Sequence, residues 1–320
     1  MAHANNNKWV SLLVGQDIEM PQTSSVDEIP YARAGFNFDS LNQNLASVAE
    51  THENIVLRTR DGQDLTAEIY VPDGDGPFPV MLYSHGGGWC VGSAEGVRRP
   101  TRKISNRGYV VVNLEYGLAP ERPFPWGLED VLYAARWVKT NISRFGGDAD
   151  RLFIAGDSAG ANLSAATLVA LRSESSGLDE GDLAGVNVDF RGALLFFGVF
   201  DFPQTLLQPG SNAGSVEMWW HLAYLGPQFA ARNTNPFVSP IFAADDVLAD
   251  FPPTYLSVGS QDSLLPQSLD FAGKLGWLNA PVELSVNSGW DHTFSYVDHL
   301  IPGVDREFDR IFDWMDRCME

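Results

Sequence analysis

Cysteine is scarce in this sequence of 320 residues, which contains only Cys90 and Cys318. Two thiols cannot form a multi-disulfide framework or a zinc site with four thiolate ligands. Long apolar runs are also missing, since none approaches the roughly 18 residues that a membrane-spanning helix needs. The first twenty residues lack the basic-then-apolar pattern of a secretory signal peptide. We therefore expect a soluble, cytoplasmic protein with no stable membrane insertion.

Basic residues are few as well. There are 21 Lys and Arg against 41 Asp and Glu, which gives a net charge of −20. A surface of this charge repels phosphate backbones and anionic lipids, so we expect neither a nucleic-acid partner nor a membrane-surface partner. Apolar residues make up 44% of the chain and charged residues 19%, which is a globular composition. The length fits one large α/β domain or two small domains.

Strand-like and helix-like segments alternate from Ile55 onward. Alternating apolar segments on either side of Asp61-Gly62 predict a β-hairpin. Continuous apolar runs, which are typical of strands buried on both faces of a parallel sheet, lie at 80–84, 109–114, 152–155, 193–197, 254–258 and 282–286. Helical patterns lie at 96–107, 126–140, 159–173, 266–278 and 304–319. This alternation predicts a doubly wound α/β sheet led by antiparallel strands.

Two stretches depart from that alternation. Residues 1–50 are polar and Asn-rich, and we expect one or two short helices that pack on something else. Within 202–250 the only strong pattern is at 216–225, which holds Trp219, Trp220 and Tyr224. We interpret it as an inserted helix that covers the C-terminal edge of the sheet, and a core helix with buried aromatics is the alternative. The expected division is a cap segment at 1–50 and a main domain at 51–320, with a cap insertion at about 202–250.

One short motif predicts a nucleophile. Gly156-Asp157-Ser158-Ala159-Gly160 fits G-x-S-x-G. It follows the expected strand 152–155 and opens the expected helix 159–173, so Ser158 would sit on a sharp strand-to-helix turn with its hydroxyl exposed. An ordinary glycine-rich turn is the alternative, but this context favours a reactive serine.

A glycine-rich loop follows the expected strand 80–84. It reads His85-Gly86-Gly87-Gly88-Trp89. Three successive glycines lose much backbone entropy when the chain folds. We expect such a run where amide N–H groups must point at a ligand oxygen. An oxyanion hole needs such donors aimed at developing negative charge. The N–H groups of Gly87, Gly88 and Ala159 are the candidates, with a flexible turn as the alternative.

A nucleophilic serine needs a base that takes its proton, and in sheets of this type the base comes late in the chain. His292 lies in the loop after 282–286, at a strand end, and is the expected base. His221 falls in the expected cap helix, where a satisfied polar contact is a better interpretation. His299 lies beyond the end of the last strand.

The acid that orients the base is expected between the serine and the histidine. Asp262 follows the strand 254–258 and is the best candidate. Asp201 is its main rival, because some sheets take the acid one strand earlier. Asp291 is adjacent to His292, and neighbouring side chains rarely reach each other in the required geometry.

Together these motifs resemble a known family. HGGGW at 85–89, GDSAGAN at 156–162, the downstream aspartate and the late histidine look like the hormone-sensitive-lipase-like carboxylesterases of the α/β-hydrolase fold. Residues 116–121 (YGLAPE), 123–131 (PFPWGLEDV) and 235–240 (NPFVSP) are similar to further segments of that family. Gly117 stands where the family usually has arginine, and Asp291 and Thr293 flank the histidine in place of the usual residues.

The resemblance implies an eight-stranded, mostly parallel sheet with helices on both faces and a helical cap. It implies ester hydrolysis through an acyl-Ser158 intermediate, with His292 as base and then acid and Asp262 orienting it. It implies no metal and no organic cofactor. The implied partner is a small-molecule ester with a short or medium acyl chain or a small aromatic group, and related esterases can form homodimers.

Side chains of the expected cap and loop are candidates for contacting that substrate. These candidates are Trp89, Trp219, Trp220, Phe36 and Phe38. Two other functions stay open. The same scaffold can serve elimination, cyclisation or acyl transfer, because a fold does not determine the reaction. A hormone-receptor role is disfavoured, because the receptors that look like this family have lost the histidine that His292 matches.

Overall fold

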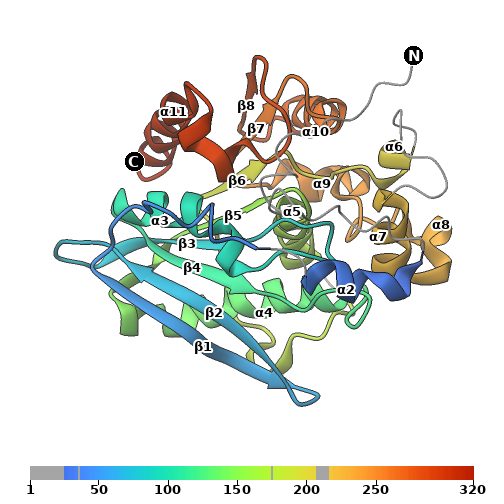
Figure 1. Ribbon diagram of the computed structural model, residues 1–320, viewed down its shortest axis with the longest axis horizontal. Coiled ribbons are helices and arrows are strands. Elements are labelled where there is room, and N and C mark those ends of the chain that lie inside the picture. The colour runs from blue at the N-terminus through green and yellow to red at the C-terminus, as the bar shows by residue number, and fades with distance from the viewer. Residues whose placement is uncertain (1–24, 35–36, 174–175, 207–215) are drawn as a thin grey trace.

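The fold is built on one eight-stranded sheet, seen in the computed structural model of the protein (Figure 1). The structure describes residues 25–34, 37–173, 176–206 and 216–320. The strands lie in the spatial order β1-β2-β4-β3-β5-β6-β7-β8. Their bounds are β1 Glu50–Arg60, β2 Gln63–Val71, β3 Phe78–Ser84, β4 Val110–Glu115, β5 Gly147–Asp157, β6 Gly192–Phe196, β7 Thr254–Gly259 and β8 Val282–Asn287.

The direction of the strands matches the expectation from the sequence. β1 and β2 form the predicted antiparallel hairpin, β2 is antiparallel to β4, and the remaining neighbours are parallel. The prediction of an eight-stranded, mostly parallel sheet is therefore confirmed. β5 begins five residues earlier than its apolar run, because Gly147 pairs with Phe78 of β3. Pairing with a neighbour extends a strand where hydrophobicity alone gives no signal.

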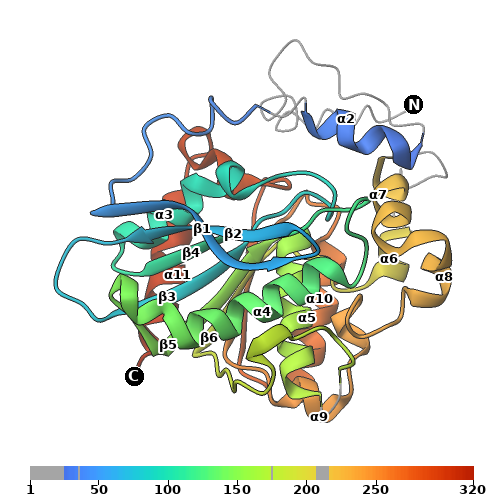
Figure 2. The ribbon, with the colours of Figure 1, turned by 90° about the horizontal axis from the view of Figure 1, so that it is seen from below.

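Helices cover both faces of the sheet (Figures 1 and 2). One apolar core lies between the sheet and α4 Trp126–Asn141, α5 Ala159–Arg172 and α10 Leu265–Trp277. The other lies between the sheet and α3 Arg98–Asn106 and α11 Val304–Arg317. The helix expected at 96–107 is instead a 3-10 turn, η2 Ala94–Val97, followed by α3.

Short helices gather beyond one end of the sheet. They are η1 Val26–Glu28, α2 Ile29–Ala34, α6 Phe202–Leu206, α7 Val216–Leu225, η5 Gly226–Gln228 and α8 Phe229–Arg232. Two more short helices, η6 Pro240–Phe242 and α9 Asp245–Ala249, pack against α5 and lead into β7. α2 and α7 come from distant parts of the chain and lie side by side in both views (Figures 1 and 2). The guanidinium of Arg33 donates to the carbonyl oxygens of Cys90 and Ala119, each at 2.8 Å. The N-terminal segment is thereby attached to loops at the carboxyl ends of the strands.

The division into a cap and a main domain stays a prediction, since part of the proposed cap lies outside the described residues. No helix in the described ranges is both long enough and apolar enough to cross a membrane.

Candidate active site

Ser158 occupies a sharp turn between β5 and α5. Its backbone has φ 51° and ψ −116°, a region that residues other than glycine rarely adopt and that stores strain. Gly156 and Gly160 allow this turn, because a Cβ on Gly156 would overlap the backbone of Gly160 and a Cβ on Gly160 would overlap the Ser84 carbonyl. The G-x-S-x-G pattern therefore places glycine at the two positions where neighbouring backbone leaves no room for a Cβ.

Three side chains from three strand ends form one chain of hydrogen bonds. His292 Nε2 lies 3.1 Å from Ser158 Oγ, and His292 Nδ1 lies 2.8 Å from Asp262 Oδ2. The Asp262 side chain is fully buried, and its other oxygen accepts the N–H of Leu264 at 2.8 Å. A carboxylate accepts only, so Nδ1 carries the proton and Nε2 is free to accept one from the serine.

The environment of His292 stabilises its charged form. Burial of the ring disfavours protonation, but the negative charge and hydrogen bond of Asp262 outweigh it and raise the pKa above the usual 6.5. Asp157 and Asp291 add to the same effect. Asp291 also accepts the backbone N–H of His292 at 2.8 Å. An imidazolium formed by proton transfer from Ser158 is therefore electrostatically favoured.

The glycine loop turns back on itself, and its Gly86 lies against Asp157. Gly87 and Gly88 have φ of 120° and 59°, and the Gly87 carbonyl accepts the N–H groups of Cys90 and Val91. Among the described residues, no hydrogen bond uses the N–H groups of Gly87, Gly88 or Ala159. Three free donors at a strand-to-helix turn and a neighbouring loop fit the requirements of an oxyanion hole.

His85 at the start of this loop has a structural environment. Its Nδ1 donates to the Gly86 carbonyl at 2.7 Å, and Tyr116 Oη donates to the His85 carbonyl at 2.9 Å. The two rings are stacked, with centroids 4.3 Å apart. Burial lowers the pKa of His85 to about 4, so the ring is neutral at physiological pH. His85 therefore shapes the loop and does not compete with His292 as a base.

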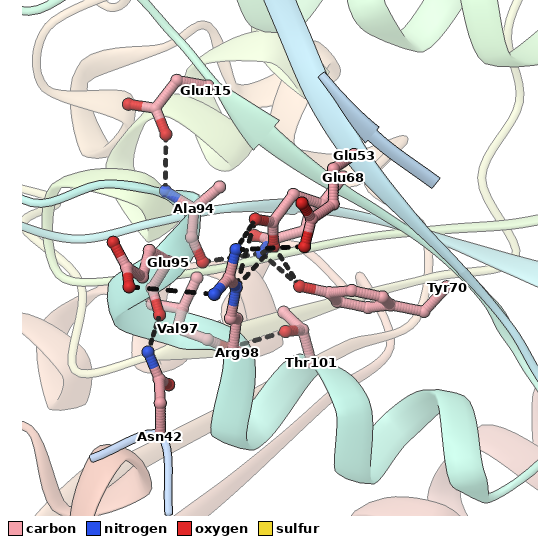
Figure 3. Close-up of polar contacts among 11 residues, drawn as sticks. Asn42, Glu53, Glu68, Tyr70, Ala94, Glu95, Val97, Arg98, Thr101 and Glu115 are labelled. Atoms are coloured by element: carbon pink, nitrogen blue, oxygen red, sulfur yellow. Dashed lines mark hydrogen bonds and ion pairs between the residues drawn. The ribbon is translucent and has the colours of Figure 1, made fainter. Parts of the chain in front are cut away.

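A half-buried polar cluster holds the segment that follows the glycine loop (Figure 3). The N–H of Ala94 donates to Glu115 Oε2 at 2.7 Å, and the Ala94 carbonyl accepts from Asn113 Nδ2 at 2.7 Å. Arg98 forms an ion pair with Glu68 in the same cluster. Burial raises the pKa of Glu115 to about 7, against the lowering effect of the Ala94 hydrogen bond. The segment after the glycine loop is thus fixed to β4 by a carboxyl group whose pKa lies near 7.

Aromatic side chains of α7 contact the glycine loop. The indole of Trp220 packs on the Cα of Gly88 so closely that a Cβ there would overlap the ring. Trp89 is buried and stacks on Tyr224, with centroids 4.6 Å apart. Trp219 is half-buried, and Phe38 packs against Gly96. Phe36 lies outside the described residues.

The alternative candidates lie elsewhere. Asp201 accepts the N–H of Gln204 at 3.0 Å at the start of α6. His299 lies 3.7 Å from Asp298. His221 is buried, with its ring centroid 4.7 Å from that of Phe202, and its Nδ1 has no hydrogen-bond partner among the described residues. The interpretation of His221 as a satisfied polar group stays a prediction.

Two further residues are explained by their contacts. Gly117 leaves room for Trp126, because a Cβ at Gly117 would lie 2.7 Å from Trp126 Cδ1. The guanidinium groups of Arg60 and Arg122 lie over that indole, at 3.9 Å and 4.7 Å from its centroid. Asp157, which the sequence reasoning passed over, is buried beside Ser158 and hydrogen-bonded to two tyrosines. Its only signal was an acidic residue at the end of an apolar strand.

Metal ligands do not gather in the described part of the chain, where no three His, Cys, Asp or Glu side chains form a group that could hold an ion.

Comparison with known proteins places this geometry in context. A sequence profile of the family described as alpha/beta hydrolase fold matches residues 81–296. The chain is 28% identical to Carboxylesterase NlhH of Mycobacterium tuberculosis, over 71% of this chain and 70% of the relative. It is 29% identical to 2-hydroxyisoflavanone dehydratase of Glycyrrhiza echinata, over 72% of this chain and 75% of the relative. The solved structure named Bacterial Heroin Esterase superposes with a TM-score of 0.76 at 24% identity, covering 93% and 94% of the two chains, which is a likeness of fold.

Proposed function

Because the chain belongs to the alpha/beta hydrolase fold family, we propose that it is a serine carboxylesterase that works through an acyl-Ser158 intermediate. The observation that carries the proposal is the hydrogen-bonded chain Ser158–His292–Asp262, with distances of 3.1 Å and 2.8 Å. The carboxylesterase name of one relative agrees with it. The three free N–H groups next to the serine supply the second requirement of acyl transfer.

The first half of the reaction forms the acyl-enzyme. Ser158 Oγ attacks the ester carbonyl carbon while its proton moves to His292 Nε2. The carbonyl oxygen becomes an oxyanion that accepts hydrogen bonds from Gly87, Gly88 and Ala159. When the tetrahedral intermediate collapses, the bond to the alkoxy group breaks and His292 returns the proton to the departing alcohol. Asp262 holds the ring in the correct tautomer throughout.

The second half regenerates the serine. A water molecule gives one proton to His292 and attacks the acyl carbon with its oxygen. Collapse of the second tetrahedral intermediate returns that proton to Ser158 Oγ and releases the carboxylic acid. The raised pKa of His292 suits both halves, because the imidazolium is formed and discharged twice.

The contact between Trp220 and Gly88 supports a compact substrate. A large indole beside a loop that is proposed to bind the carbonyl oxygen leaves limited room for an acyl chain. We propose esters with short to medium acyl groups, or small aromatic esters. Replacing Trp220 with alanine is expected to move the preferred acyl chain to greater length. Trp277→Ala on α10, where the side chain is 86% exposed, is the matched control and should keep the wild-type preference.

The decisive experiment measures hydrolysis of p-nitrophenyl esters from acetate to laurate. Wild type should turn over with a chain-length optimum, and Ser158→Ala should be inactive. Ser164→Ala is the matched control on α5, since its hydroxyl bonds the Ala155 carbonyl, and it should stay active. Mass spectrometry of a rapidly quenched reaction should find the acyl group on Ser158. A folded wild-type protein with no turnover on any ester, or an active Ser158→Ala variant, would refute the proposal.

A non-hydrolytic reaction at the same site is the second candidate, and the observation that favours it is the dehydratase among the relatives. An elimination forms its product without adding water, so the product mass distinguishes it. Incorporation of ¹⁸O from labelled water into the product acid supports hydrolysis, whereas a product lighter than the substrate by one water supports elimination.

A further inference from the structure

A buried carboxylate that the triad does not include stands next to the nucleophile. Asp157 is the last residue of β5, and its side chain is fully buried. Its Oδ1 accepts a hydrogen bond from Tyr83 Oη at 3.0 Å, and its Oδ2 accepts one from Tyr296 Oη. The backbone N–H of Gly86 also donates to this carboxylate and lowers its pKa.

The three donors come from three separate segments. Tyr83 belongs to β3, Gly86 to the glycine loop, and Tyr296 to η7 Phe294–Leu300. Gly86 approaches so closely that a Cβ on it would overlap Asp157 Oδ2. Tyr296 lies four positions after His292, so its bond connects the histidine segment to the backbone of the nucleophile turn. Asp157 therefore joins the base, the glycine loop and Ser158 into one rigid unit.

The charges of Asp157 and His292 affect each other's pKa. Burial raises the pKa of Asp157 to about 6, while the bonds from Tyr296 and Tyr83 and the charge of protonated His292 lower it. Asp157 is therefore largely ionised at pH 7. Burial holds the pKa of Tyr83, Tyr116 and Tyr296 well above 10, so these phenols stay neutral. Asp262, Asp157 and Asp291 together raise the pKa of His292.

We propose that Asp157 is a second carboxylate that stabilises the His292 imidazolium, and that Tyr296 is the positioning residue that keeps Asp157 ionised. The inference rests on the proposed esterase function. Asp157 exchanges no proton with the substrate. It acts through its field on His292 and through the contacts that hold the glycine loop, and Tyr296 acts through Asp157.

The test compares three variants of the full chain. Tyr296→Phe removes one hydroxyl and should lower kcat about tenfold, the size of one charged hydrogen bond, with KM changed less than twofold. Asp157→Asn removes the charge and keeps the shape. Tyr255→Phe is the matched control, because Tyr255 is another buried tyrosine that donates to a buried carboxylate, Glu307 Oε1 at 3.2 Å, far from Ser158 in the sequence.

The pH profiles separate an electrostatic role from a merely structural one. In Tyr296→Phe, Asp157 takes up a proton more readily, so the acid limb of the rate profile should move to higher pH. In Asp157→Asn, His292 loses a neighbouring negative charge, so the acid limb should move to lower pH. Tyr255→Phe should leave the limb where it is. Shifts of the acid limb in opposite directions in the two variants support the proposal. If the acid limb of Tyr296→Phe lies at the same pH as in wild type, the proposal is overturned, even when the variant is less stable.

A second measurement needs no turnover. The pKa of His292 can be read from its imidazole nitrogen shifts by NMR, and it should be lower in Asp157→Asn than in wild type. Unchanged titration of His292 overturns the proposal. This readout holds whether or not the protein cleaves esters, so failure of the esterase function and failure of the Asp157 role are distinguishable. If Asp157→Asn does not fold, the direction in which the acid limb of Tyr296→Phe shifts decides the question by itself.

Discussion

His292 Nε2 lies 3.1 Å from Ser158 Oγ, although 134 positions separate the two residues in the chain. Ser158 follows β5 and His292 follows β8, and β6 and β7 lie between these strands in the sheet. The two side chains meet because parallel strands end at the same edge and because the segment after β8 folds back across that edge. The contact brings the serine hydroxyl within hydrogen-bond reach of the imidazole.

The two acid candidates can be separated by matched substitutions. Asp262→Asn should lower kcat by about 10³- to 10⁴-fold, because an amide cannot hold the His292 tautomer that accepts the serine proton. Asp201→Asn should keep kcat within about twofold and cost only the stability of a helix-start hydrogen bond, of the order of 1 kcal/mol. Steady-state kinetics and thermal unfolding of both variants test this. Comparable losses of kcat would contradict the assignment of Asp262.

The rate should depend on pH through His292. The base must be neutral to accept a proton, and its pKa lies above 6.5, so kcat/KM should fall as the pH drops through that raised value. Asp291→Asn removes one of the charges that raise this pKa, and the acid limb should move to lower pH. Asp313→Asn on the exposed side of α11 changes the net charge equally and should leave the limb in place. Equal shifts would mean that only net charge matters.

Replacing Gly88 with alanine should reduce activity far more than the same substitution at a glycine of similar backbone geometry. Gly88 and Gly226 have φ of 59° and 71°, so alanine at either position is strained by similar amounts, of the order of 1 kcal/mol. A Cβ at Gly88 would overlap Trp220, whereas nothing lies within 4 Å at Gly226. Gly88→Ala should therefore lower kcat/KM by about 100-fold or more by displacing an oxyanion donor. Similar activity of the two variants would argue against this role.

Glu115 should make stability depend on pH. Its pKa is raised to about 7 in the folded protein from the ordinary 4.5, so the folded state holds the proton more tightly than the unfolded state. The free energy of unfolding should therefore fall as the pH rises from about 4.5 to 7.

The variant Glu115→Gln keeps an acceptor for the Ala94 N–H and removes the titration. It should match wild type at pH 4.5 and be more stable than wild type at pH 8, by up to a few kcal/mol. Urea unfolding at the two pH values measures the difference. A difference that does not change with pH would show that Glu115 stays ionised in the folded protein.

Much of the sheet could be predicted from the sequence, because strands and turns have recognisable local patterns of residues. The run 109–114 was apolar at every position except Asn113, and it became the buried centre of β4. Asp61-Gly62 predicted the turn between β1 and β2. The start of β5 was missed, since Gly147 to Arg151 is polar and joins the strand through pairing with β3. The helix expected at 96–107 was wrong in its first turn, where η2 precedes α3.

The sequence by itself determined the turn that holds Ser158, because glycine at 156 and 160 and a strand before a helix are properties of neighbouring residues. It also limited the candidates for the base and for the orienting acid to a few residues at strand ends. The tertiary structure decided what the side chains touch. Asp157 became a shared acceptor for Tyr83 and Tyr296, and Trp220 came to lie on Gly88. These contacts join residues far apart in the chain, and they depend on strand order and helix placement, which no local pattern encodes.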